Sequence, residues 1–107
     1  MAESGFEKVS ETSEVAPGEM KSIQLDGEEL LLANVDGNYY VISDTCSHRG
    51  GPLSSGELNG DQVECPLHGA VFSVVTGDVV SPPASSGVPA REVRISGNEI
   101  LVGPANR

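Results

Sequence analysis

The sequence has few cations, no long apolar run and no tryptophan. Its 107 residues contain 6 lysines and arginines against 16 aspartates and glutamates, which gives a formal net charge of −10. Nucleic acids and anionic lipids both bind through clustered cations, so this balance argues against either partner. A membrane span needs roughly 18 consecutive apolar residues, whereas the longest apolar run here is Leu30–Ala33.

The beginning of the chain lacks the features of a secretory signal. The first eight residues, MAESGFEK, contain neither a basic segment nor the apolar segment that would follow it. We therefore expect a cytoplasmic protein. Since domains typically hold about 100–150 residues, we also expect residues 1–107 to form one domain.

What the sequence does contain is a series of short apolar or alternating runs separated by turn-forming residues, a pattern typical of β-structure. The strongest hairpin signal is Asp36-Gly37 between two such runs, because the favoured two-residue turn needs positive φ. The predicted hairpins pair 29–35 with 38–43, 71–75 with 79–80 and 91–95 with 99–102; weaker strands are predicted at 6–10 and 21–25. No window has convincing helical periodicity, so we predict an all-β fold, an antiparallel sandwich or barrel.

Two details of this pattern lead to further expectations. Val93 and Ile95 alternate with Arg94, which predicts one buried and one exposed face for that strand. The segment 81–90 is rich in proline, serine and glycine and resembles a linker in composition. Only one predicted hairpin follows it, which is too little for a second domain, so we expect a structured loop.

All the cysteines and histidines of the chain lie within one short stretch. They form the pattern C-x-H-x16-C-x2-H, made of Cys46, His48, Cys65 and His68, and each pair lies in a turn-rich segment between predicted strands. Three interpretations of these residues remain open. A disulfide between the cysteines would leave the paired histidines unexplained and is disfavoured in the cytoplasm. A Cys2His2 zinc site uses the same donors, although a C-x-H pair is less typical of it. The third is an iron–sulfur cluster.

The third interpretation comes from a resemblance. The segments CSHRGGPL (46–53) and CPLHGAVF (65–72) resemble the two cluster loops of Rieske-type [2Fe–2S] proteins. Thr76-Gly77 matches the hairpin that follows those loops, and Pro82-Pro83-Ala84 is similar to the proline loop that covers the cluster. The resemblance extends from about Leu30 to Val102 and implies a Rieske-like fold with a small cluster-binding subdomain at about 44–84.

The resemblance also implies a ligand set. Cys46 and Cys65 would bind one iron, and His48 and His68 would bind the other. Two ferric ions, two sulfides and two thiolates cancel in charge, so this cluster is easier to reduce than one held by four thiolates. Rieske centres span about −150 to +300 mV, against about −400 mV for plant-type ferredoxins.

Several neighbouring residues receive expected roles. Gly50, Gly51 and Gly69 would permit tight loops. The apolar residues expected to shield the cluster and form a docking rim are Leu53, Leu67 and Pro83, with ordinary core packing as the alternative for each. Arg49, beside His48, would either steer a partner or be a solvated loop residue.

The resemblance further predicts a low redox potential. Respiratory members of the family have an extra disulfide between the loops, and here those positions hold Gly51 and Leu67. The same members have a serine and a tyrosine that donate hydrogen bonds to the cluster, at positions that hold Ala70 and Phe72 here. Without these donors, we expect a potential near the lower end of the Rieske range.

The chain is too short for the mononuclear-iron domain of an oxygenase and has no third histidine. The resemblance therefore implies a free-standing Rieske ferredoxin, a one-electron carrier and not itself an enzyme. It would accept electrons from an NAD(P)H-dependent flavoprotein reductase and pass them to a terminal oxygenase, docking near His48 and His68, and we expect a monomer. The alternatives are a small accessory subunit of a larger redox enzyme, similar to that of nitrite reductase, and a zinc-binding interaction module.

Overall fold

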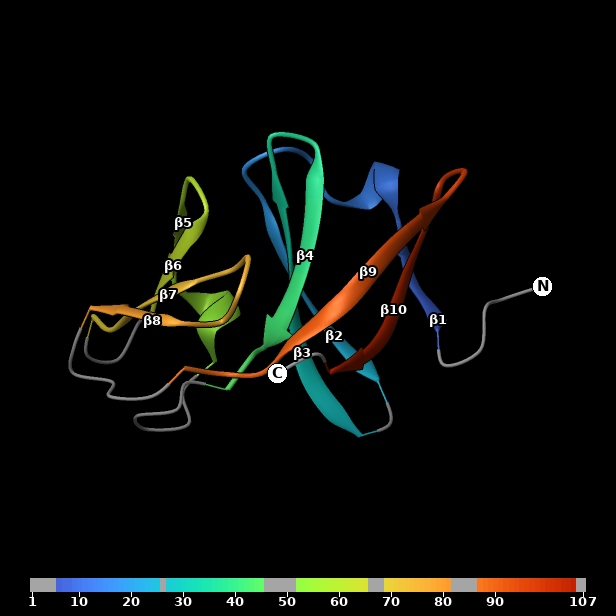
Figure 1. Ribbon diagram of the computed structural model, residues 1–107. Coiled ribbons are helices and arrows are strands. Elements are labelled where there is room, and N and C mark those ends of the chain that lie inside the picture. The colour runs from blue at the N-terminus through green and yellow to red at the C-terminus, as the bar shows by residue number, and fades with distance from the viewer. Residues whose placement is uncertain (1–5, 26, 46–51, 66–68, 82–86, 106–107) are drawn as a thin grey trace.

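The computed structural model describes residues 6–25, 27–45, 52–65, 69–81 and 87–105. These residues form ten strands and two single-turn 3-10 helices (Figure 1). The strands are β1 (Glu7–Glu11), β2 (Met20–Leu25), β3 (Glu28–Val35), β4 (Asn38–Ser43), β5 (Glu57–Asn59), β6 (Gln62–Glu64), β7 (Val71–Ser73), β8 (Val79–Ser81), β9 (Ala90–Ser96) and β10 (Glu99–Ala105). The 3-10 helices are η1 (Thr12–Glu14) and η2 (Leu53–Ser55). Neither helix in the described part of the chain is long and apolar enough to cross a membrane.

The strands form two antiparallel sheets that lie beside each other (Figure 1). The large sheet has the order β1-β10-β9-β4-β3-β2, and the small one has the order β5-β6-β7-β8. The chain passes from the large sheet to the small sheet after β4 and returns at β9, so the small sheet is an insertion between two neighbouring strands. This confirms the predicted all-β sandwich or barrel.

Strand β3 explains why the longest apolar run of the chain lies where it does. Alternate side chains of a strand point to opposite faces, and both faces of β3 are buried. Leu30 and Leu32 pack inside the large sheet, whereas Leu31 and Ala33 pack toward the small sheet. The β3–β4 hairpin is therefore a wall shared by two apolar clusters.

The second of these clusters, which we call the intersheet core, joins the two sheets. It consists of Leu31, Ala33, Ile42, Leu53, Val63, Cys65, Ala70, Phe72, Val74, Val88 and Ala90. Its members come from β3, β4 and β9 of the large sheet and from the small sheet with its connecting segments. The small sheet is thereby fixed on one face of the β3–β4 wall.

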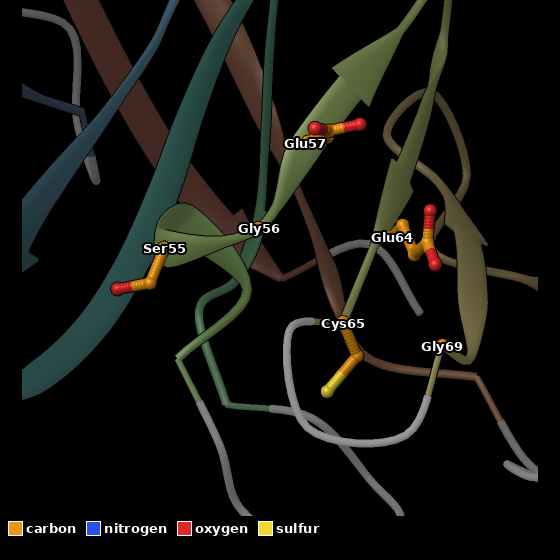
Figure 2. A pocket seen from close by; sticks show the side chains of 6 residues that line it. All are labelled: Ser55, Gly56, Glu57, Glu64, Cys65 and Gly69. Atoms are coloured by element: carbon orange, nitrogen blue, oxygen red, sulfur yellow. The ribbon is translucent and has the colours of Figure 1, made fainter.

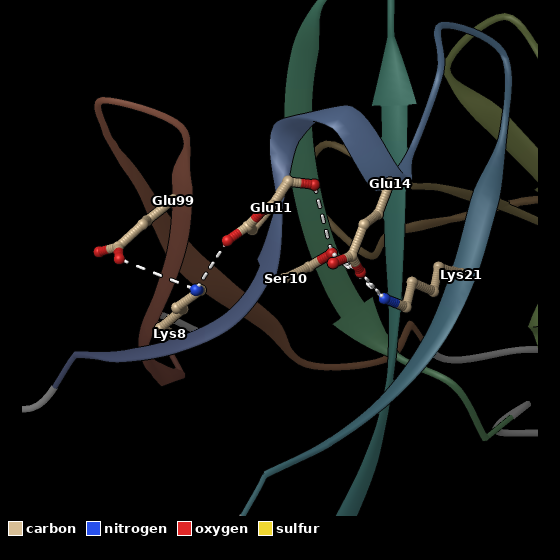
Figure 3. Close-up of polar contacts among 6 residues, drawn as sticks. All are labelled: Lys8, Ser10, Glu11, Glu14, Lys21 and Glu99. Carbon is tan, nitrogen blue, oxygen red and sulfur yellow. Dashed lines mark hydrogen bonds and ion pairs between the residues drawn. The ribbon is translucent and has the colours of Figure 1, made fainter.

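The large sheet is nearly closed, and polar side chains connect its two edge strands, β1 and β2. Lys21 on β2 forms an ion pair with Glu14 and donates a hydrogen bond to the hydroxyl of Ser10, at 3.3 Å (Figure 3). Ser10 also donates to the Glu14 carboxylate at 3.0 Å. On the neighbouring β1–β10 pair, Lys8 forms ion pairs with Glu11 and Glu99.

Most of the predicted strands are confirmed within one or two residues. The turn between β3 and β4 falls at Asp36-Gly37, both with positive φ (53° and 91°), as the hairpin type requires. Strand β4 has the predicted bounds, and β9 and β10 extend slightly beyond theirs.

Three strand predictions need correction. The β5–β6 hairpin was not predicted, although Asn59-Gly60 between Leu58 and Val63 is a turn signal. Strand β7 ends at Ser73 instead of Val75, because the chain turns there and the amide of Val74 donates to the carbonyl of Asp61.

The third correction concerns Ile95, which was expected on a buried face and is 48 % exposed. Strand β9 pairs with β4 only at Arg91 and Ala90, so its distal half has β10 as its one strand neighbour. The hairpin tip thus extends beyond the core, and alternation alone does not bury Ile95.

The Glu14–Lys21 ion pair makes stability depend on pH. The hydrogen bond from Lys21, followed by that from Ser10, lowers the pKa of Glu14 below its ordinary value. A carboxylate whose folded pKa is lowered stabilises the fold above about pH 4.3, its ordinary value, and loses that contribution as the pH falls through the folded value. We therefore expect Glu14→Gln to lower the urea midpoint at neutral pH and the difference from wild type to vanish in acid.

A double-mutant cycle with Lys21→Met provides the control. In the Lys21→Met background, Glu14→Gln should have little further effect, and added salt should weaken the wild-type advantage, because both side chains are exposed. An effect of Glu14→Gln that persists in both conditions would contradict this account of the ion pair.

Candidate metal centre

One of the four predicted ligands, Cys65, lies in the described part of the chain. Cys46, His48 and His68 lie outside the described residues, as do Arg49, Gly50, Gly51, Leu67 and Pro83. The site is therefore described from Cys65 and from the residues that flank the three segments 46–51, 66–68 and 82–86.

Cys65 directly follows β6 and is 2 % exposed. Its amide donates to the carbonyl of Ala70 at 2.7 Å, and the amide of Gly69 donates to the carbonyl of Cys65 at 3.1 Å. Gly69 has a φ of +80°, which confirms the tight turn expected there. Backbone hydrogen bonds therefore fix both ends of the segment 66–68.

The side chain of Cys65 leaves the small sheet in a direction away from the carboxylates of Glu57 and Glu64 (Figure 2). A pocket next to it is lined by Ser55, Gly56, Glu57, Glu64, Cys65 and Gly69. Thiolate is the soft donor that iron–sulfur clusters use, and a nearly buried sulfur keeps water away from a bound metal. Cys65 thus fits the role of a ligand on the inner side of a cluster.

Asp44 closes the first segment in the same way that Ala70 closes the second. Its carboxylate accepts two hydrogen bonds from Ser54, one from the amide at 2.6 Å and one from the hydroxyl at 2.9 Å. The carbonyl of Asp44 accepts from the amide of Leu53 at 2.7 Å, and Thr45 and Pro52 form an isolated β-bridge. Asp44 is 2 % exposed, so this clamp is shielded from water.

The end of the third segment, 82–86, is held between the two sheets. The amide of Val88 donates to the carbonyl of Gly77 at 2.8 Å, and the amide of Ser43 donates to the carbonyl of Pro89 at 2.9 Å. Gly77 belongs to the turn between β7 and β8, and Ser43 ends β4. The residues that follow 82–86 therefore contact both sheets.

The flanks of all three segments meet in the intersheet core. Leu53 follows the first segment, Cys65 precedes the second and Ala70 follows it closely, and Val88 follows the third; all four are buried members of that core. The sequence predicted that segments distant along the chain would converge on one site. The fold places their described ends at one apolar cluster, which is the arrangement that such a site needs.

The predicted role of Leu53 is partly corrected. Leu53 is 0 % exposed, so it cannot belong to a docking rim. It packs in the intersheet core because η2 turns its side chain inward behind the Asp44 clamp. Ala70 and Phe72 are also fully buried, and neither has a hydroxyl that could donate a hydrogen bond to a metal ligand.

Sequence reasoning missed Asp44, Ser54 and Gly56, all of which shape this region. An aspartate and a serine separated by nine residues form no recognised motif, so no sequence signal indicated the clamp. Gly56 could have been found only through the unpredicted β5–β6 hairpin that it precedes.

Comparison with known proteins adds to this geometry. The Rieske [2Fe-2S] domain matches residues 5–95. The chain is 40 % identical over 98 residues to the biphenyl dioxygenase ferredoxin subunit of Pseudomonas sp. (strain KKS102), a match that covers 91 % of this chain and 90 % of that protein.

Solved structures are similar over nearly the whole chain. The ferredoxin of carbazole 1,9a-dioxygenase from Nocardioides aromaticivorans IC177 has a TM-score of 0.90 and 33 % identity, covering 94 % of this chain and 99 % of that one. A chain in a complex of reduced oxygenase and oxidized ferredoxin in carbazole 1,9a-dioxygenase has a TM-score of 0.89 and 33 % identity, with 94 % of each chain covered.

The Asp44 clamp leads to a prediction about stability. Asp44→Ala leaves the amide of Ser54 without its acceptor and removes a buried group, so it should lower the free energy of unfolding by about 1–3 kcal/mol. Ser54→Ala removes only the hydroxyl hydrogen bond and should cost less, about 0.5–1.5 kcal/mol. Urea unfolding of both variants measures the two costs, and an equal or greater loss for Ser54→Ala would contradict the clamp.

Proposed function

This chain belongs to the Rieske [2Fe–2S] domain family, and from that premise we propose that it is the ferredoxin component of an aromatic-ring dioxygenase system. The observation that carries the proposal is the match to a biphenyl dioxygenase ferredoxin subunit over about nine-tenths of both chains. Further relatives are named as ferredoxin components of naphthalene 1,2-dioxygenase systems. These names favour a carrier over an accessory subunit or a zinc-binding module.

The family implies a [2Fe–2S] cluster, and we assign its four ligands within this proposal. Cys46 and Cys65 bind one iron, and His48 and His68 bind the other. When bound, the cluster takes up and releases one electron at a time. The burial of Cys65, the closed base of its segment and the convergence of three segments on the intersheet core support the assignment.

The protein's own residues hold the ligands in place and limit the access of water. The amide of Cys65 is occupied by the carbonyl of Ala70, which fixes the direction in which the thiolate leaves β6. The Asp44–Ser54 hydrogen bonds fix the end of the segment that carries Cys46 and His48. Because these flanks are buried, small displacements of the ligands are resisted by close packing.

The electron partners are a flavoprotein reductase that uses NAD(P)H and a terminal oxygenase. Carbazole 1,9a-dioxygenase provides a solved precedent in which an oxygenase and a ferredoxin form a complex. Docking near His48 and His68 would bring the outer iron toward the partner. The net charge of −10 suits a carrier that meets basic surfaces transiently. Residues 1–107 act as one Rieske domain with its cluster region at about 44–84, and the protein works as a cytoplasmic monomer.

The ligand assignment predicts the composition of the purified protein. It should be red-brown and contain two irons and two acid-labile sulfides per chain, as the [2Fe-2S] formula requires. Cys65→Ser and His68→Ala should lose the iron and the ability to support oxygen uptake by a reconstituted reductase and oxygenase. Glu64→Gln changes an exposed neighbour of Cys65 and should keep its full iron content. A colourless protein with one zinc per chain would overturn the assignment.

The absence of side-chain donors at Ala70 and Phe72 predicts a low potential, near the lower end of the range of about −150 to +300 mV for Rieske centres. Ala70→Ser adds a hydroxyl at a buried position next to Cys65 and should raise the potential, because a hydrogen bond to sulfur favours the reduced, more negative state. Ala70→Val is a matched control of similar size without a donor. Redox titration of the three proteins measures the effect; a wild-type potential well above 0 mV would contradict the prediction.

A further inference from the structure

Gly56 makes an unusually close contact with the backbone that carries Cys65. It lies between η2 and β5, opposite Glu64 at the end of β6 (Figure 2). A Cβ atom at position 56 would lie 1.8 Å from the carbonyl oxygen of Glu64 and 3.0 Å from its carbonyl carbon. The φ of Gly56 is −88°, so its backbone conformation is open to other residues and the constraint is steric. Any side chain there must displace the carbonyl of Glu64.

That carbonyl belongs to the same peptide unit as the amide of Cys65. The amide donates to the carbonyl of Ala70 at 2.7 Å, so a displaced carbonyl disturbs the hydrogen bond that closes the segment 66–68. On its other side, the amide of Gly56 donates to the carbonyl of Leu53 at 2.9 Å, and Leu53 is held by Asp44. Gly56 therefore connects the base of the first segment to Cys65.

A second pair of backbones meets in the same way at the end of the third segment. A Cβ atom on Gly87 would lie 2.4 Å from the carbonyl oxygen of Gly77, which is the acceptor of the Val88 amide. Gly87 is not among the glycines with positive φ, so this constraint is also steric. The contact seats the residues that follow 82–86 on the turn between β7 and β8.

We propose that Gly56 and Gly87 are positioning residues of the cluster site, whose missing side chains set the distances between the three segments that hold or cover the cluster. The inference rests on the proposed cluster. Each glycine allows one backbone to rest directly on another, so the segments cannot approach or separate without breaking a hydrogen bond. Displaced ligands alter both the retention of a metal group and its electronic properties.

The experiment compares Gly56→Ala and Gly87→Ala with Gly103→Ala. Gly103 is a matched control, because a Cβ there would lie 2.6 Å from the ring of Phe6, yet it lies on β10, in the large sheet and outside the intersheet core. For each protein the measurements are the thermal midpoint, the rate at which visible absorbance is lost, the visible circular dichroism and the redox potential.

We expect Gly56→Ala and Gly87→Ala to lose visible absorbance about 10-fold faster than wild type, with a changed visible dichroism and a shifted potential. Gly103→Ala should lower the thermal midpoint and keep the dichroism and the potential of wild type. If Gly56→Ala is insoluble, Gly87→Ala decides the question. Equal cluster properties in all three variants, or the same changes in Gly103→Ala, would overturn the inference. A wild-type protein without iron would instead overturn the proposed function.

Discussion

The intersheet core is the constraint on which the rest of the structure depends. Leu53, Cys65, Ala70 and Val88 flank three separate segments of the chain, and all four are buried in the same apolar cluster against the β3–β4 wall. Burial of each such side chain contributes roughly 1.5–3 kcal/mol for the larger ones, and close packing resists displacement. The energy that joins the two sheets therefore also fixes the described ends of the proposed ligand segments relative to one another.

Hydrogen bonds refine what apolar packing sets coarsely. The core brings the flanks together, while the Asp44–Ser54 pair, the Cys65–Ala70 pair and the Val88–Gly77 bond fix the direction of each flank. The polar residues that close the large sheet, Ser10, Glu14 and Lys21, lie elsewhere, on β1, η1 and β2. Changes of charge in that seam therefore affect the stability of the large sheet and leave the contacts around Cys65 in place.

Local patterns in the sequence predicted much of the fold and the kind of site, because both depend on short-range signals. Asp36-Gly37 specified a hairpin through backbone conformation, and the spacing of cysteines and histidines indicated a metal centre. The Asp44 clamp and the contact of Gly56 with Glu64 could not be predicted, because they depend on which backbone segments the folded core brings together. Ile95 shows the same limit: its alternation with Arg94 indicated burial, yet its exposure is decided by how far β4 extends alongside β9.

The central claim is that Cys46 and Cys65 hold one iron of a [2Fe–2S] cluster and that His48 and His68 hold the other. Pulsed electron paramagnetic resonance of the reduced protein tests it most directly, because directly bound imidazole nitrogens couple far more strongly to the unpaired electron than distant ones do. The account predicts strong coupling to two histidine nitrogens, with one of the two lost in a variant that lacks either histidine. A cluster without strongly coupled nitrogen, or no paramagnetic cluster in the reduced protein, would contradict it.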